Sequence, residues 1–75
     1  MTIHLTYFAS LRDERGLGSE TYQTTAATYE ALYRELGFKL PINLVGVAIN
    51  GAFGAMSDPV KDGDQVVFIP PVAGG

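Results

Sequence analysis

The chain has 75 residues, of which 47% are apolar and 17% are charged, so it is long enough for one small folded domain and too apolar for a disordered segment. It contains no cysteine, which excludes disulfides, thiolate metal sites and a cysteine nucleophile. The net charge is −3 and the five basic residues are scattered, which argues against a nucleic-acid-binding surface.

Residues 2–8 are predicted to form a strand, because their side chains alternate with the period of two that a strand requires. One face is apolar and should be buried, whereas the other is mixed and should be partly covered; the two faces are Ile3, Leu5 and Tyr7, and His4, Thr6 and Phe8. A short helical turn from Ser10 to Gly16 should follow. A second strand, at residues 20–24, is expected to pair antiparallel with the first.

Residues 29–36 carry the clearest helix signal in the chain. Thr28 is a good N-cap residue, and Gly37 suits the left-handed position after a helix. Four apolar side chains fall on one stripe, namely Tyr29, Leu32, Tyr33 and Leu36. A helix of about eight residues does not persist alone, so we expect this one to pack across a sheet.

The second half of the chain predicts three more strands. After a connector at residues 38–43, in which Pro41 argues against helix, strands are expected at residues 44–49, 53–56 and 66–69. Asn50-Gly51 is a strong signal for a tight hairpin between the first two of these strands. The last strand is apolar throughout, which is typical of a strand covered on both faces and central in its sheet.

This order of elements predicts an α+β fold of the β-grasp (ubiquitin-like) type, with a mixed four- to five-stranded sheet and one main helix packed across it. The alternative is a generic α+β meander. We prefer the β-grasp because it explains why the most apolar strand comes last. Residues 1–75 should form one domain, with a flexible C-terminal tail at residues 72–75.

The chain ends in an unusual way. Pro70 and Pro71 lack a backbone N–H and must end the last strand, and their fixed φ favours a stiff exit from the sheet. The remaining residues, at about 3.3 Å each, reach roughly 13 Å and end on Gly74 and Gly75, which have the least hindered backbone. We therefore expect the Gly75 carboxylate to be the functional group of the molecule. The alternative is a terminus that finishes in glycine by chance.

Other candidate sites are weaker. A lone His4 on a strand is more often a surface or packing residue than a base or a ligand. The aspartates between residues 58 and 64 lack a calcium-loop pattern and fit turn capping better, so we expect no metal site. An apolar docking patch is predicted at Phe8, Phe68, Pro70 and Val72, with the alternative that both phenylalanines belong to the core. No apolar run reaches membrane-spanning length, and we expect a soluble cytoplasmic protein.

Three stretches resemble the small subunit of molybdopterin synthase. They are Tyr7-Phe8-Ala9-Ser10-Leu11-Arg12-Asp13, Val47-Ala48-Ile49-Asn50-Gly51 and the closing run from Lys61 to Phe68-Ile69-Pro70-Pro71-Val72-Ala73-Gly74-Gly75. The resemblance runs through the whole chain in order. The connector from Gly37 to Asn43 is shorter than in many members of that family, which leaves another sulfur pathway as an alternative.

The resemblance implies a sulfur carrier that is not itself an enzyme. Gly75 would be adenylated by an enzyme related to those of ubiquitin activation and converted to a thiocarboxylate, with Gly74 allowing close approach. The tail, including Pro71, Val72 and Ala73, would enter the large synthase subunit, in what we expect to be a heterotetramer, and deliver sulfur to a pyranopterin precursor. No bound cofactor is expected. Two alternatives remain, a sulfur carrier for thiamine thiazole synthesis and a ubiquitin-like modifier or interaction module.

Overall fold

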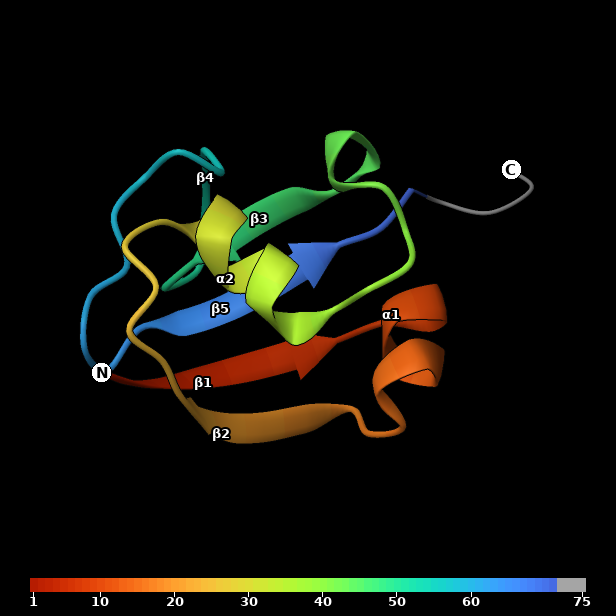
Figure 1. Cartoon of the computed structure of the whole chain (residues 1–75), viewed down its shortest axis with the longest axis horizontal. Helices are drawn as coiled ribbons and strands as arrows, with labels where there is room; N and C mark the ends of the chain where they lie inside the picture. Colours follow the sequence, from red (N-terminus) through yellow and green to blue (C-terminus); the bar gives the residue numbers. More distant parts are fainter. Residues whose placement is uncertain (72–75) are drawn as a thin grey trace.

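A computed structural model describes residues 1–71 and shows a mixed five-stranded sheet (Figure 1). The strands are β1 (Thr2–Tyr7), β2 (Ser19–Gln23), β3 (Gly46–Ile49), β4 (Ala52–Gly54) and β5 (Gln65–Ile69). They lie in the order β2-β1-β5-β3-β4, with β5 parallel to β1 and the other neighbours antiparallel. The last strand is central, as predicted, because it lies between the first and the third. The β-grasp prediction is confirmed, and a meander is excluded by the same pairing.

Helix α2 (Tyr29–Leu36) forms within the predicted limits. The Thr28 Oγ1 accepts a hydrogen bond from the backbone N–H of Ala31 at 3.2 Å, and Gly37 ends the helix with φ +75°. The apolar stripe of the helix packs on the sheet, where its four side chains join Ile3, Leu5, Tyr7, Leu11, Val45, Val47, Val60, Val66 and Phe68 in one core. The packing follows from the hydrophobic period of the sequence.

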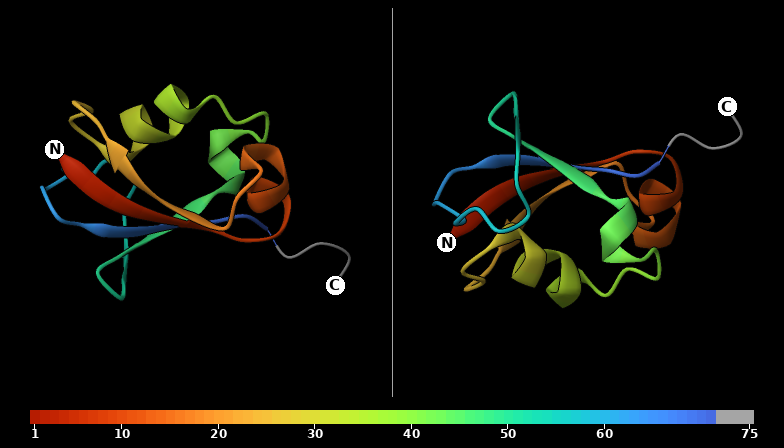
Figure 2. Two further views of the ribbon diagram at one scale, coloured as in Figure 1. Left: turned by 90° about the horizontal axis from the view of Figure 1, so that it is seen from below. Right: turned by 90° about the horizontal axis from the view of Figure 1, so that it is seen from above.

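All helical segments that the structure describes lie on one side of the sheet. Figure 2 shows α1 (Ala9–Arg15), α2 and the 3-10 helix η1 (Ile42–Leu44) on this side, with the other side of the sheet uncovered over residues 1–71. No helix within residues 1–71 is long and apolar enough to cross a membrane. Strand side chains that project to the uncovered side therefore have no helix of residues 1–71 packed over them.

The first helix and the connector differ from the prediction. Helix α1 begins at Ala9, one residue before the predicted start at Ser10, and Phe8 is its N-cap residue without a side-chain hydrogen bond. The connector contains η1, although Pro41 was expected to exclude helix there. Proline is well suited to the position just before or at a first helical turn, because its missing N–H is not needed there.

The hairpin strands are also shorter than predicted. β3 begins at Gly46 rather than at residue 44, because η1 occupies the preceding residues. β4 covers residues 52–54 rather than 53–56, since pairing resumes directly after the two-residue turn, with Ile49 opposite Ala52. The turn itself is as predicted, with Asn50 at φ 52° and Gly51 at φ 86°.

Candidate functional site

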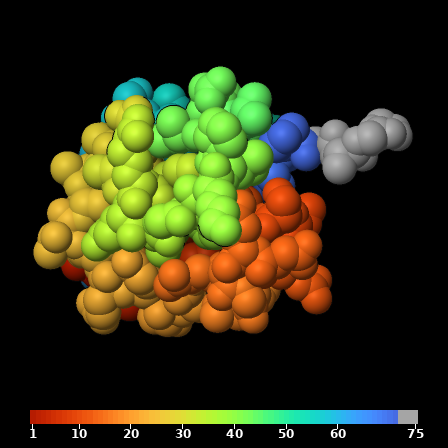
Figure 3. Space-filling model, turned by 45° about the vertical axis from the view of Figure 1, so that its right-hand side comes forward, coloured from red at the N-terminus to blue at the C-terminus, as the bar shows by residue number. Residues whose placement is uncertain are grey.

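The central strand β5 leads directly to the C-terminal segment. β5 ends at Ile69, where the two prolines were predicted to end it. Pro70 is buried and Pro71 is exposed. Figure 3 shows this end of β5 leaving the body between the segment of α1 and that of η1. Val72, Ala73, Gly74 and Gly75 lie outside the described residues, so their predicted roles stay predictions.

The uncovered side of the sheet carries an apolar area that extends from the middle of β5 to the end where this strand finishes. It consists of side chains from three strands and from the residue after β1, and we call it the open apolar face: Phe8, Ala48, Phe53, Val67 and Ile69. One row of paired residues crosses it, because Val67 lies opposite both Thr6 and Ala48, and Ala48 lies opposite Phe53. Phe53 is 87% exposed and Phe8 is 54% exposed. Large aromatic side chains at such exposure are typical of a protein-binding surface.

The predicted docking patch was wrong in two of its four members. Phe68 has no exposed surface, because its side chain faces α2 and its ring centroid lies 5.2 Å from that of Tyr33. Pro70 is also buried. Phe8 is exposed as predicted, and Val72 lies outside the described residues. The core interpretation that was left open therefore holds for Phe68.

Sequence reasoning missed Phe53, Val67 and Ile69 as members of the face. The signal was present in the alternation of the last strand, because burying Val66 and Phe68 places Val67 and Ile69 on the other side. For Phe53 the signal was the Asn50-Gly51 turn, which sets a register with Ala48 opposite Phe53. The exposed face thus follows from strand pairing rather than from the apolar run itself.

The rest of the same side of the sheet is polar. His4 is exposed, and its Nδ1 lies 3.3 Å from the Thr21 Oγ1. Next to this pair, the Gln23 Nε2 donates to the Thr2 Oγ1 at 2.7 Å. These contacts lie over β1 and β2, away from Phe53. The side chains on this side of the sheet are therefore divided into an apolar part and a hydroxyl- and amide-rich part.

A buried carboxylate fixes the entry to β5. Asp64 is 4% exposed and accepts hydrogen bonds from the Tyr29 hydroxyl, from the Asn50 Nδ2 at 3.0 Å and from the backbone N–H of Lys61 at 2.8 Å. Burial acts against ionisation of Asp64, but these hydrogen bonds outweigh it and hold its pKa below the usual range. Burial and the bond to Asp64 raise the pKa of Tyr29. The network joins α2, the hairpin turn and β5.

The other two aspartates of this region also accept hydrogen bonds from backbone N–H groups. The Asp58 Oδ2 accepts from the N–H of Ala55 at 3.0 Å, and the Asp62 Oδ1 accepts from the N–H of Thr2 at 2.7 Å. Asp58 and Asp64 each accept from a backbone N–H three residues earlier, so the turn-capping interpretation is confirmed for them. It does not hold for Asp62, whose bond reaches β1, 60 residues away in the chain. Within residues 1–71, no three His, Cys, Asp or Glu side chains come together in a way that could hold a metal ion.

Comparison with known proteins places these features in a family context. The model of the ThiS family matches residues 5–75. The molybdopterin synthase sulfur carrier subunit of Haemophilus influenzae is 31% identical over 80 residues, which cover 97% of this chain and 99% of that protein. The solution structure of the HVO 2177 protein of Haloferax volcanii is 29% identical with a TM-score of 0.76, over 100% of this chain and 87% of that chain.

A further similar structure is that of a complex. In the complex of subunits 1 and 2 of the molybdopterin-converting factor from Helicobacter pylori, the matching chain is 24% identical with a TM-score of 0.66, and the match covers 100% of both chains. At this identity the match supports the fold alone. It agrees with the topology found here, in which the last strand is central.

Proposed function

This chain belongs to the ThiS family, and from that premise we propose that it is the sulfur carrier subunit of a molybdopterin synthase. The carbonyl carbon of Gly75 is the reacting centre in this proposal. The observation that carries it is the direct continuation of the central strand β5, through Pro70 and Pro71, into Gly74 and Gly75 in a chain of this family. A central strand is held on both sides, so it provides a firm base for a segment that has to reach into a partner.

The proposed chemistry begins with activation of a poor electrophile. A carboxylate does not release its oxygen, whereas the mixed anhydride with AMP does. An adenylating enzyme joins the Gly75 carboxylate to the α-phosphate of ATP and releases pyrophosphate. A sulfide-equivalent donor then attacks the same carbon, AMP leaves, and the product is a C-terminal thiocarboxylate.

Sulfur delivery returns the carrier to its starting state. In the active site of the large subunit, the thiocarboxylate sulfur attacks a carbon of the pyranopterin precursor and forms a thioester, while the bond from that carbon to an oxygen substituent breaks and the oxygen leaves with the electron pair. Water then hydrolyses the acyl–sulfur bond, which leaves sulfur on the pterin and a carboxylate on Gly75. Two such deliveries supply the two sulfurs of a dithiolene. The carrier needs no resident cofactor and no base of its own in this cycle.

The glycines suit this chemistry for steric reasons. Gly75 has no Cβ, so a nucleophile approaches its carbonyl carbon with little crowding. Gly74 allows the backbone to pass close to the wall of a narrow channel. Pro71 is exposed at the end of the described chain, and its fixed φ limits the directions that the following residues take.

In this proposal the open apolar face is the surface that the large subunit binds. Phe8 and Ile69 lie at the end of the sheet where β5 finishes, so a partner that covers this part of the face also lies beside the start of the C-terminal segment. Its two most exposed residues are aromatic, the class of residue that most often dominates binding energy. Recognition and delivery therefore use neighbouring parts of the molecule.

Intact-mass analysis tests the proposal. Protein isolated from cells that contain the sulfur pathway should include a species heavier by the difference between a sulfur and an oxygen atom, located on the C-terminal peptide. Incubation of that species with purified large subunit and precursor should form molybdopterin and restore the lighter mass. Conjugates to lysine side chains of many proteins, or transfer to a thiazole precursor alone, would contradict the proposal.

A further inference from the structure

Helix α1 depends on contacts with the rest of the molecule. It has seven residues, no side-chain N-cap hydrogen bond and no acidic residue in its first turn. A helix of this length has little stability by itself. Its position is set instead by the burial of Leu11 and by the Glu14 carboxylate, which accepts from the backbone N–H groups of Lys39 at 2.6 Å and Leu40 at 3.3 Å.

The junction between β1 and α1 is strained next to Phe8. Ala9 has φ 48°, in the left-handed region that alanine rarely adopts because its Cβ crowds the backbone there. This bend turns the chain from the strand into the helix, and the Phe8 carbonyl accepts from the N–H of Leu11 at 3.1 Å and of Arg12 at 3.3 Å. Strained backbone persists where surrounding contacts enforce it. The orientation of Phe8 on the open apolar face thus depends on contacts that hold both sides of the bend.

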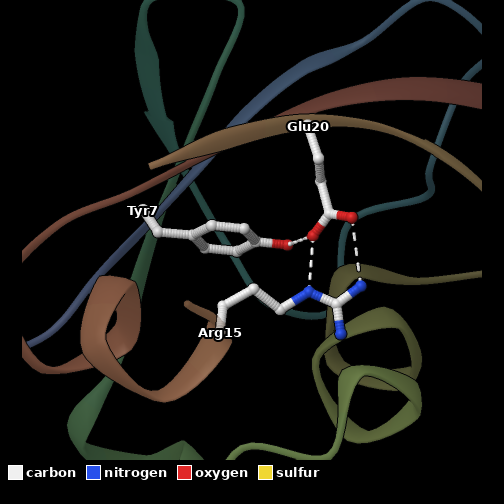
Figure 4. A network of polar contacts seen from close by, with 3 residues as sticks. All are labelled: Tyr7, Arg15 and Glu20. Carbon is white, nitrogen blue, oxygen red and sulfur yellow. Dashed lines mark hydrogen bonds and ion pairs between the residues drawn. The ribbon is translucent and has the colours of Figure 1, made fainter. Parts of the chain in front are cut away.

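One polar network binds the chain on both sides of the bend at Ala9 (Figure 4). The Glu20 Oε2 accepts from the Tyr7 hydroxyl at 2.7 Å and from the Arg15 Nε at 2.5 Å, and the Glu20 Oε1 accepts from the Arg15 Nη2 at 3.0 Å. Tyr7 is the last residue of β1 and Arg15 is the last residue of α1, so Glu20 of β2 joins the two ends of the segment that contains Phe8 and Ala9. The two-donor pair with Arg15 fixes orientation as well as distance.

The network is partly shielded from water. Tyr7 is 1% exposed, and burial followed by the bond to Glu20 raises its pKa. The hydrogen bond from Arg15 holds the pKa of Glu20 below its usual range, although burial acts in the other direction. Glu20 is therefore ionised at neutral pH, and the pair with Arg15 is charged. By contrast, the Glu30–Arg34 pair on α2 is exposed and 3.6 Å apart.

We propose that Arg15 and Glu20 are positioning residues for partner binding, because by joining Tyr7 to the end of α1 they hold Phe8 in the orientation that the large synthase subunit binds. The inference rests on the proposed function. It concerns how the docking surface is kept ready, and not the sulfur chemistry at Gly75. Without the network, α1 retains its Leu11 and Glu14 contacts but samples other orientations, and only a fraction of the molecules presents Phe8 correctly. The apparent dissociation constant rises by the inverse of that fraction.

A double-mutant cycle tests the proposal with the full chain and the purified cognate large subunit. Arg15→Ala, Phe8→Ala and the combined variant are compared with the wild type by isothermal titration calorimetry at a temperature where all are folded. We expect Arg15→Ala to raise the Kd about five- to tenfold when Phe8 is present. In the chain that already carries Phe8→Ala, the same substitution should raise the Kd less than about twofold. A purely structural role would lower the melting temperature and leave the Kd of the folded protein unchanged.

Two further variants complete the test. Arg15→Lys keeps the charge but loses the two-donor geometry, so it should lie between the wild type and Arg15→Ala. Arg34→Ala removes an ion pair from α2 and should leave the Kd unchanged. If Arg15→Ala does not fold, Tyr7→Phe replaces it, since it removes one hydroxyl and keeps the ring that packs on Phe38 with centroids 5.5 Å apart.

The outcomes separate this inference from the proposed function. Equal effects of Arg15→Ala in both backgrounds, or a Kd unchanged by it, overturn the positioning role while wild-type binding and sulfur delivery stand. An unchanged Kd for Phe8→Ala overturns it as well. A wild-type chain that neither binds the large subunit nor forms a thiocarboxylate overturns the proposed function, and the inference with it.

Discussion

Truncation of Phe53 should separate binding from folding. The side chain is 87% exposed in β4 and makes almost no core contact, so Phe53→Ala should change the free energy of unfolding by less than about 0.5 kcal/mol. In the proposed complex the same ring becomes buried, and full burial of a phenylalanine side chain contributes about 2–3 kcal/mol. Loss of that contribution corresponds to a Kd raised about 30- to 150-fold.

The measurement combines calorimetric titration of the large subunit with urea unfolding of the free carrier. Most of the change should appear as faster dissociation, because mutations within one interface affect that rate more than association. Thr21→Ala is the matched control, since it lies on the same side of the sheet in the polar part over β2. An affinity within twofold of the wild type for Phe53→Ala would refute the assignment of the open apolar face as the docking surface.

Three further predictions concern the core network, a helix end and the reacting terminus. Asp64→Ala leaves the Tyr29 hydroxyl and two N–H donors without their acceptor and should cost about 3 kcal/mol in urea unfolding at pH 7. The pKa of Asp64 in the folded chain is lowered from 3.8, so the ionised carboxylate contributes its full stabilisation of the folded state above pH 3.8. This stabilisation is lost as the pH falls through the lowered pKa of the folded chain. An Asp64→Ala chain that shows the same acid-dependent loss of stability would contradict this. Gly37→Ala should cost about 1 kcal/mol in the same assay because its φ is +75° with no neighbour within 4 Å of an added Cβ, and a neutral result would show that this helix end relaxes. Deletion of Gly75, or Gly74→Val, should abolish sulfur transfer with the melting temperature nearly unchanged; unfolding of either variant would show instead that these residues are structural.

Elements with local signals were predictable from the sequence. Helix α2 was found with its limits because its cap, its apolar stripe and its terminal glycine are all encoded within ten neighbouring residues. The central position of β5 was predicted correctly from its apolar run. The expectation that β5 is covered on both faces was wrong, because Val67 and Ile69 lie on the uncovered side of the sheet. The mixed sheet was predicted from the order of elements rather than from any single residue, and the parallel pairing of β5 with β1 was not predicted separately.

Features that depend on distant contacts were not predictable in the same way. Ser10 has good capping chemistry, yet α1 starts one residue earlier because the bend at Ala9 is enforced by tertiary contacts. Tyr7, Arg15 and Glu20 gave no pattern in the sequence, since their meeting depends on the pairing of β1 with β2 and on the direction of α1. The exposed aromatic surface was misjudged for a similar reason, because hydrophobicity alone does not reveal which side of a strand is covered.

The parallel ladder between β1 and β5 sets the point from which the C-terminal segment extends. It holds Tyr7 opposite Phe68. Phe8, which follows β1, and the C-terminal segment, which follows β5, therefore leave the sheet at the same end. Gly75 is six residues beyond Ile69, and covalent geometry keeps it within about 20 Å of that strand end. An acceptor active site has to lie inside this radius once the carrier is bound. Insertion of one residue after Pro71 would widen the radius without altering the bound surface, so reach and affinity are independent properties of this small chain.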